Sequence, residues 1–422
     1  MPISGKLALD DAHVPAKAMS TASVLRWLAI FVFVLSTALN YLDRLLLAAV
    51  APTVKAEFHL SNVQYGQIIS AFSIVYAVMA PAAGWLIDRA GLSLSMTLAM
   101  SVWSMAGIFT GITRSFSGLF VSRTVLGIGE AACIPAFGKV NGLYLAPREL
   151  AFGTAVNQVG IALGSIAAPL LVAAMAPVWG WRSVFVISGA LGFVWIPLWW
   201  FTSRRISPPQ TAQKREPDSD QIGRVLRDRR IWALMVANAL VMTLYTLWTN
   251  WTTVFFVDRY GLSEAVANRQ FAWVPTVFAT LGGFCGGWMT YRAIREGTGE
   301  FSARMRTCWV AAIAVVVTSL VPAMPTPLLA AGAISFSFFW CLAISTNLYA
   351  MPIGFFGVGR AGFGVSMLTC SYGLMQTVLS PAIGFLVDHF GFTPVCWSMS
   401  LLPLVGIAIL QIAGRPVPAT KA

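Results

Sequence analysis

Long apolar runs alternate with short polar connections along nearly the whole of this 422-residue chain. Each run is close to the ~20 residues that an α-helix needs to cross a bilayer. The first six cover 25–50, 62–86, 93–113, 116–144, 150–177 and 182–203. The second six cover 231–257, 269–291, 305–323, 327–350, 361–387 and 392–413, of which 269–291 is more polar. The pattern predicts an all-α integral membrane protein with twelve transmembrane helices in two six-helix halves.

The polar segments between and beside these runs set the expected organisation. We expect a cytoplasmic N-terminal segment over 1–24, a six-helix bundle over 25–203 and a cytoplasmic central loop over 204–230. A second six-helix bundle over 231–414 and a cytoplasmic C-terminal segment over 415–422 complete the chain. Only 10% of the residues are charged and 57% are hydrophobic, whereas soluble domains carry about 25% charged residues.

The positive residues are distributed unevenly between the two expected sides of the membrane. If both termini are cytoplasmic, 21 of the 28 Lys and Arg residues lie inside, five lie outside, and Arg44 and Arg123 lie within spans. The positive-inside rule therefore favours this orientation. It also explains the net charge of +12 without a nucleic-acid partner. The short loops and termini favour a bacterial inner membrane.

One short motif occurs twice, at the ends of the second and the eleventh span. Gly84-Trp-Leu-Ile-Asp88-Arg89-Ala-Gly91 and Gly384-Phe-Leu-Val-Asp388-His-Phe-Gly391 share the spacing Gly-x3-Asp-x2-Gly. One copy faces the cytoplasm and the other faces outside, as three-helix inverted repeats within each half require. We interpret Gly84, Asp88, Arg89 and Gly91 as a motif that controls conformation.

Charged residues lie inside two of the expected spans. Asp43 and Arg44 are adjacent in Asn40-Tyr41-Leu42-Asp43-Arg44, and Arg123 and Glu130 share the fourth span. Each such charge at bilayer depth costs roughly 2.5–3.5 kcal/mol by conservative scales, unless a partner or a water-filled cavity receives it. Arg123 and Glu130 are two helical turns apart, about 10.5 Å along the axis, so each is expected to meet the first helix rather than the other. These four charges are typical of a transporter.

With these motifs, the whole chain resembles the major facilitator superfamily. Gly84 to Gly91 resembles its signature loop, although Leu92-Ser93 stand where that loop prefers basic residues, and the stretch from Gly286 to Arg292 lacks the corresponding aspartate. The stretch from Asn40 to Arg44 and the Arg123-x6-Glu130 spacing resemble the anion:cation symporter branch, which includes hexuronate, galactonate and glucarate carriers and vesicular glutamate and sialic acid carriers. The resemblance implies proton-coupled uptake of an organic anion by alternating access.

The four charges have candidate roles in that cycle. Arg44 is expected to hold the substrate carboxylate, because guanidinium matches carboxylate geometry; otherwise it only neutralises Asp43 or Glu130. The resemblance implies that Asp43 and Glu130 carry the proton, and the alternative is a fixed ion-pair network. Arg123 is expected to relay between them, with direct substrate contact or a purely structural charge as the other interpretations.

Polar side chains at membrane depth supply the remaining binding candidates. Tyr41, Tyr76 and Gln158 match family positions near the sugar-acid site, and Asn157 is the neighbouring amide. In the second half, Asn347, Tyr372 and Gln376 are candidates where the family completes its cavity, although an asparagine expected in the eleventh span has no counterpart here. Each of these residues could instead pack between helices with its polar group satisfied.

The sequence thus favours a proton-coupled importer of a sugar acid: a hexuronate, an aldonate or an aldarate. Alternatives are a symporter of an aromatic acid or a dicarboxylate, a proton-driven exporter, and a receptor that binds without transport. No nucleophile–His arrangement or phosphate loop points to an enzyme, and no Cys/His spacing points to a metal. We expect no cofactor besides the coupling proton, no nucleic-acid partner, and a functional monomer in the lipid bilayer.

Overall fold

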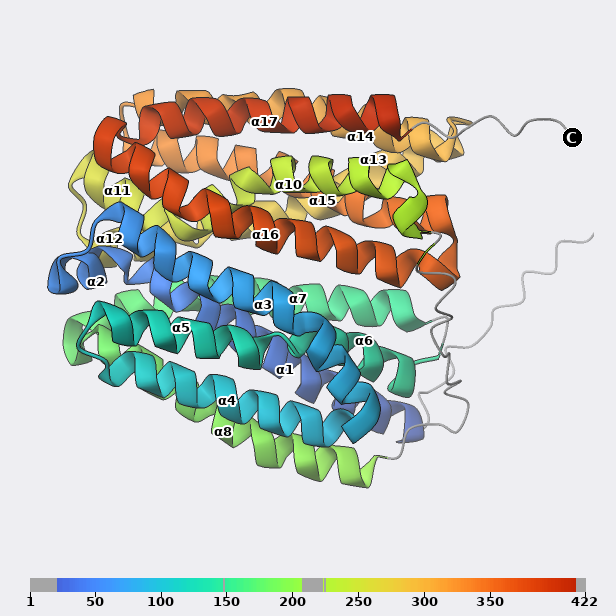
Figure 1. Cartoon of the computed structure of the whole chain (residues 1–422), viewed down its shortest axis with the longest axis horizontal. Helices are drawn as coiled ribbons and strands as arrows, with labels where there is room; N and C mark the ends of the chain where they lie inside the picture. Colours follow the sequence, from blue (N-terminus) through green and yellow to red (C-terminus); the bar gives the residue numbers. More distant parts are fainter. Residues whose placement is uncertain (1–20, 147–148, 207–222, 224, 415–422) are drawn as a thin grey trace, which may run out of the picture.

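The computed structural model describes residues 21–146, 149–206, 223 and 225–414 (Figure 1), and within these ranges it contains helices and no strands. The terminal segments expected over 1–24 and 415–422 and the central loop expected over 204–230 fall largely outside the described residues. Their cytoplasmic placement stays a prediction.

The N-terminal half consists of α1 to α8. Its helices are α1 (Thr21–Ala49), α2 (Ala51–Phe58), α3 (Asn62–Ala90), α4 (Leu92–Ile112), α5 (Phe116–Glu130), α6 (Cys133–Tyr144), α7 (Leu150–Trp179) and α8 (Trp181–Arg205). The expected span 116–144 is therefore interrupted directly after Glu130. Short α2 begins with Pro52 in its first turn, where the missing N–H costs nothing.

The C-terminal half consists of α10 to α17. Its α-helices are α10 (Arg229–Asn250), α11 (Thr252–Tyr260), α12 (Glu264–Ala267), α13 (Val274–Arg295), α14 (Glu300–Ala314), α15 (Pro327–Phe356), α16 (Val358–Phe390) and α17 (Phe392–Ala413). A π-helical turn (Asn268–Ala272) precedes α13, and a 3₁₀ segment (Val315–Ala323) continues α14.

Eleven helices in the described ranges are long and apolar enough to cross a membrane, against the twelve that the sequence pattern predicts. The difference is the span expected over 269–291, which the structure builds as the π-helical turn followed by α13. Three threonines, four glycines and two arginines lower the hydropathy of α13, and it is not among the eleven. Two of those threonines line the cavity described below, which explains why this helix departs from the lipid-facing pattern.

Both copies of the repeated motif end a helix in the same way. Gly91 closes α3 with a φ of 86°, and Gly391 closes α16 with a φ of 72°. A side chain is strained at such angles, so the last glycine of each copy is required by the backbone. The chain can then turn directly into the next helix.

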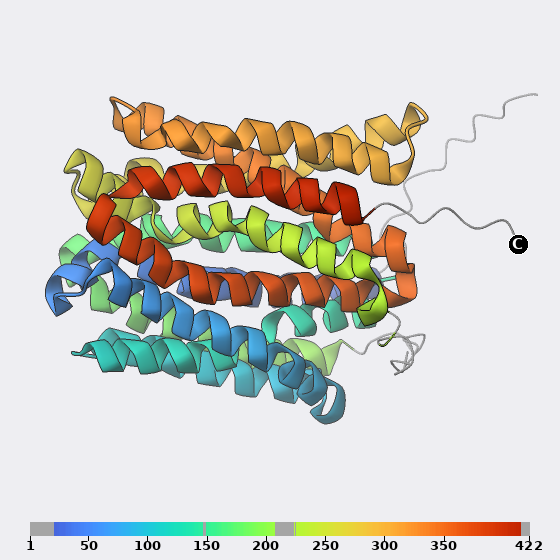
Figure 2. The same cartoon turned by 45° about the horizontal axis from the view of Figure 1, so that its top comes forward.

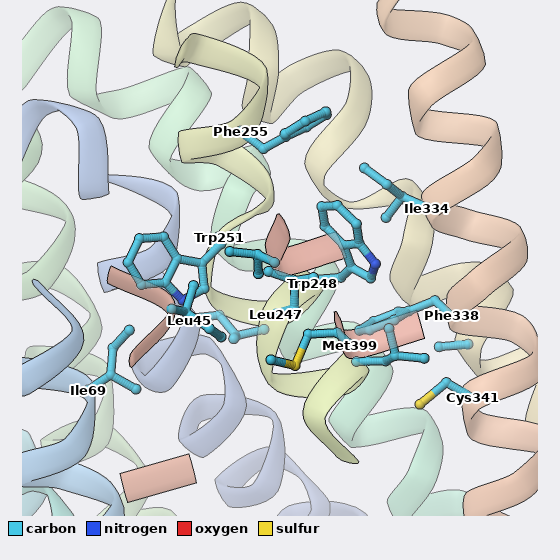
Figure 3. Close-up of a cluster of buried hydrophobic side chains, with 14 of the residues drawn as sticks. Leu45, Ile69, Leu247, Trp248, Trp251, Phe255, Ile334, Phe338, Cys341 and Met399 are labelled. Atoms are coloured by element: carbon cyan, nitrogen blue, oxygen red, sulfur yellow. The ribbon is translucent and has the colours of Figure 1, made fainter. Parts of the chain in front are cut away.

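The two halves meet along α3 and α16, which lie side by side in both views (Figures 1 and 2). A core of buried side chains continues from one half into the other. Figure 3 shows part of it, with Leu45 and Ile69 of the N-terminal half among Leu247, Trp248 and Trp251 of the C-terminal half. The ring of Trp251 also packs edge-on against Tyr65, with 5.1 Å between the ring centres.

Hydrogen bonds join the halves at the end of the bundle that carries α2, α11 and α12, which we call the latched end (Figure 1). Asp388 accepts from the backbone N–H groups of Asn62 (3.1 Å) and Val63 (3.2 Å) and from the side-chain amide of Asn62 (2.7 Å). These N–H groups open α3 and have no partner within the helix, and the helix dipole favours a carboxylate there. The carboxylate of α16 thus caps a helix of the other half.

Further bonds strengthen this closure. Thr53 N–H donates to Glu264 (2.9 Å), the Tyr65 hydroxyl donates to the carbonyl of Asn250 (2.9 Å), and the Asn268 amide donates to the carbonyl of Ala49 (2.7 Å). Within the described part of the chain, every hydrogen bond between the halves involves residues 49–73 of the N-terminal half. Hydrogen bonds therefore hold the halves together at the latched end and along the adjoining part of α3.

Asp88, the counterpart of Asp388 in the repeat, makes no such link to the described residues of the other half. It pairs with Lys139 of its own half, with 2.7 Å between Oδ1 and Nζ. Its neighbour Arg89 lies over the ring of Trp85, 5.4 Å from the ring centre. The two copies of the motif are in different states, one engaged across the halves and one held within a half.

Replacing Asp388 by Asn should loosen the latched end. The substitution removes the negative charge from the first turn of α3, and a hydrogen bond to a charged group contributes about 1.5–3 kcal/mol. We expect amide hydrogen exchange of residues 62–66 to accelerate about tenfold, as measured by mass spectrometry. Glu296→Gln, in an exposed pair with Arg292, is the matched control. Unchanged exchange in Asp388→Asn would show that the cap does not hold the halves together.

Candidate functional site

Arg44 and Glu130 form an ion pair between α1 and α5. The guanidinium donates to Glu130 Oε2 through Nε (3.2 Å) and Nη2 (3.0 Å), and Nη2 also reaches Asn40 Oδ1 (3.4 Å). The Glu130 side chain is fully buried, whereas 18% of the Arg44 side chain is exposed. None of these bonds uses Nη1. The arginine therefore keeps donor capacity toward a ligand while it holds the carboxylate.

Three aromatic rings surround the same guanidinium. Its central carbon lies 5.1 Å from the ring centre of Tyr41, 4.8 Å from that of Phe72 and 4.7 Å from that of Tyr76. Ring faces attract a cation and exclude water, and such contacts are stronger when they are desolvated. The cage fixes Arg44 in place without neutralising its charge. Tyr41 and Tyr76, predicted as substrate contacts, are part of this cage.

Arg123 and Asp43 form the second charged group, also between α5 and α1. Arg123 Nη1 donates to the backbone carbonyl of Asp43 (3.2 Å), and the guanidinium lies 5.2 Å from the ring centre of Phe185. Neither carboxyl oxygen of Asp43 has a hydrogen-bond partner among the described residues, and Nε and Nη2 of Arg123 are equally unpaired. The nearby Ser188 hydroxyl donates to a carbonyl of its own helix instead.

The seven-residue spacing on α5 predicts that Arg123 and Glu130 each contact α1 rather than one another. The hydrogen bonds in the structure agree with this prediction. Two buried charged groups result: Arg44 bonds to one carboxylate oxygen of Glu130, whereas the Asp43 carboxyl group has no partner among the described residues. A buried carboxylate without a partner is costly, and either a cation or a proton relieves that cost. The relay role of Arg123 stays a prediction.

A cavity with two lobes lies beside these charges, between the halves. The smaller lobe, about 50 Å³, borders Tyr41, Arg44, Arg123, Tyr372 and Gln376, among other residues. The larger lobe, about 250 Å³, is lined by residues of α1, α7, α10, α11, α13 and α15 and by Ala272. Leu45, Ala48, Tyr245 and Thr249 belong to both linings, so the lobes adjoin. The cavity thus runs from the charged groups into the C-terminal half.

The structure brings most of the predicted binding residues to this cavity, but not all of them. Gln158 lines the larger lobe, and Gln376 lines the smaller one while accepting a hydrogen bond from Ser73 (3.0 Å). Tyr76, Asn157 and Asn347 lie outside both linings. Asn347 is fully buried and donates to the carbonyls of Gly286 (3.2 Å) and Ala343 (2.9 Å).

Asn347 also accepts from the Thr290 hydroxyl (2.7 Å), so its amide links α13 to α15. Its position favours a packing role between helices, the alternative interpretation of its polar side chain, over contact with a substrate. Asn157, by contrast, keeps a buried side-chain oxygen without a partner in the described part of the chain.

Sequence reasoning missed several residues of the cavity wall. Tyr245 and Thr249 of α10 border both lobes, and Thr276, Thr280 and Thr346 line the larger one. Tyr245 packs edge-on against Tyr372, with 5.9 Å between ring centres. A signal existed in α13, because two threonines four residues apart share one helix face in a run that is less apolar than its neighbours.

Within the described residues, no group of three or more His, Cys, Asp or Glu side chains could hold a metal ion. Buried charges beside a cavity between two halves of a helical bundle define a class of protein, a membrane transporter. The chain matches the model of the Major Facilitator Superfamily over residues 33–352. It belongs to that superfamily, whose members are transporters and not enzymes.

Individual relatives agree with this assignment. The chain is 27% identical over 415 residues to the hexuronate transporter of Escherichia coli (strain K12), covering 94% of this chain and 96% of that protein. It is 31% identical over 282 residues to the galacturonate transporter of Dickeya chrysanthemi, covering 63% of this chain and 81% of that protein.

Among solved structures, the fold is similar to a bacterial homologue of the human lysosomal transporter Spinster in an inward-facing and occupied conformation. The TM-score is 0.77 at 20% identity, covering 93% of this chain and 99% of that one. This likeness supports the helical architecture, in which the charged groups of α1 and α5 lie beside the cavity.

Removing the charge of Arg44 alone should destabilise the fold more than removing both charges of the Arg44–Glu130 pair. Breaking a buried ion pair by deleting one partner costs about 3–5 kcal/mol, because the other charge stays buried. We expect Arg44→Met to lower the thermal unfolding temperature in detergent, and the double variant Arg44→Met/Glu130→Gln to recover part of that loss. Arg292→Ala, in an exposed pair, should change it little. Equal unfolding temperatures for the single and the double variant would contradict the ion-pair account.

Proposed function

We propose that the protein couples proton entry to the uptake of a small organic anion, with a sugar acid such as a hexuronate or an aldonate as the substrate. The observation that carries this proposal is the Arg44–Glu130 pair at the edge of the cavity. Arg44 is the cation that an anion requires, and it is already bonded to a carboxylate that competes for it. The names of the two relatives support a sugar acid.

Competition for Arg44 supplies the coupling. A substrate carboxylate that bonds to the guanidinium weakens its bonds to Glu130, which then takes a proton because it is buried without a partner. When the substrate leaves, Arg44 returns to Glu130 and the proton is released. Asp43 is the second candidate carrier, because Arg123 holds its backbone carbonyl and leaves its carboxyl group without a hydrogen bond. Each substrate thus moves with a proton.

The latched end is the outer side in this proposal. The positive-inside distribution supports an orientation with α2, α11 and α12 outside the cell and both termini in the cytoplasm of a bacterium, with the protein in the inner membrane. Hydrogen bonds across the halves then close the outer side, and the transport cycle requires them to break so that substrate enters. Asp88 and Lys139 lie on the cytoplasmic side. The proton is the only coupling species proposed, and one chain suffices as the functional unit.

Uptake of labelled galacturonate into proteoliposomes, with and without an inward proton gradient, tests the coupling. We expect the gradient to accelerate uptake by the wild type severalfold. Glu130→Gln removes the titrating group and keeps a similar shape, so it should lose the response to the gradient while substrate exchange continues. Glu296→Gln should behave as the wild type.

Wild-type uptake that is the same with and without the proton gradient would reject proton symport. A Glu130→Gln variant that still responds to the gradient would remove Glu130 from the coupling. Outward movement of substrate driven by an inward proton gradient would favour an exporter. Binding without exchange would favour a receptor.

A further inference from the structure

The two lobes of the cavity differ in charge. The lining of the smaller lobe includes Arg44 and Arg123, both of which come from the N-terminal half. The lining of the larger lobe contains no Asp, Glu, Lys, Arg or His residue. A ligand that fills both lobes therefore meets cations at one end only.

The larger lobe carries hydroxyl groups instead. Thr280, Thr346 and Ser165 each donate to a carbonyl of their own helix, at 3.0, 3.0 and 2.8 Å. A hydroxyl whose proton is used in this way still has oxygen lone pairs to accept with. Sugar hydroxyls are donors that need such acceptors. Three acceptors on three helices suit a ligand with several hydroxyl groups.

Other groups of this lobe fit the same ligand. Gln158 adds an amide that can both donate and accept. Trp248 and Phe338 add apolar ring surface for the C–H faces of a sugar, and the buried indole N–H of Trp248 has no partner among the described residues. The lobe is thus equipped for a neutral polyol.

We propose that the cavity selects acids with one carboxylate and an uncharged hydroxylated body, as in hexuronates and aldonates, and rejects six-carbon aldarates. This inference rests on the proposed function, since it assigns the two ends of the same substrate. The carboxylate lies at Arg44, and the hydroxylated body lies in the larger lobe between α7, α13 and α15. An aldarate places its second carboxylate in that lobe, where it loses water and gains no cation.

Competition in counterflow exchange tests the selection. Proteoliposomes exchange labelled galacturonate at pH 7, and unlabelled galacturonate, galactonate, galactarate or glucarate is added as competitor. We expect the two monocarboxylates to compete at similar concentrations, and the two aldarates to require roughly 100-fold more, because an unpaired carboxylate is desolvated. Galactarate that competes as well as galacturonate would overturn the inference and leave the proposed function standing. Absence of any sugar-acid exchange would overturn both.

Variants of the larger lobe test whether it is the part of the cavity that rejects a second carboxylate. Thr346→Lys places a cation in the neutral lobe, so galactarate should compete at least tenfold better in this variant than in the wild type.

A second variant tests whether the hydroxylated body lies in the larger lobe. Thr280→Val removes an acceptor and keeps the side-chain shape, so the KM for galacturonate should rise several-fold. Thr124→Val is the matched control, because Thr124 donates to its own helix in the same way (2.9 Å) but lies outside both linings. A KM unchanged in Thr280→Val, or changed equally in Thr124→Val, would contradict the assignment of the body to this lobe.

Discussion

Arg44 must remain charged within a bundle of apolar helices, and the structure around it follows from that constraint. Glu130 accepts two of its N–H bonds, and three aromatic rings enclose its guanidinium. A second charged group, Arg123 with Asp43, lies on the same two helices. Burial of the two arginines is tolerable because they border a cavity rather than lipid. The N-terminal half therefore supplies the charge of the site, and the C-terminal half supplies much of its neutral wall.

Among the described residues, the hydrogen bonds between the halves lie at the latched end and along the adjoining part of α3. Asp388 caps α3 across the halves, whereas the equivalent Asp88 pairs within its own half. Alternating access requires the two ends of the bundle to open in turn. The structure, in which only the Asp388 copy of the motif bonds to the other half, corresponds to one of these two states. The cavity lies between the halves beside α1 and α10, where relative movement of the halves changes its access. In the proposed function, α1, α3 and α16 link the substrate site and the proton carriers to the hydrogen bonds between the halves.

Much of this arrangement could be read from the sequence, because its physical causes are local. Apolar runs predict the long helices, and the paired Gly-x3-Asp-x2-Gly motifs predict equivalent helix ends. The charges of α1 and α5 stand out against hydrocarbon. Cavity walls are harder to predict, because a threonine facing a cavity resembles a threonine that bonds to its own helix. Asn347 shows the converse: its polarity suggested a ligand contact, but its amide joins α13 to α15. Only packing separates the two cases.

Competition between substrate and Glu130 for Arg44 is the central claim, and proton uptake on binding tests it most directly. Calorimetric titration of the purified protein with galacturonate, in buffers of different ionisation enthalpy, counts the protons that accompany binding. The account predicts that the wild type takes up protons when substrate binds, and that Glu130→Gln binds substrate without this uptake. Binding with no proton uptake in the wild type, or with the same uptake in Glu130→Gln, would contradict it.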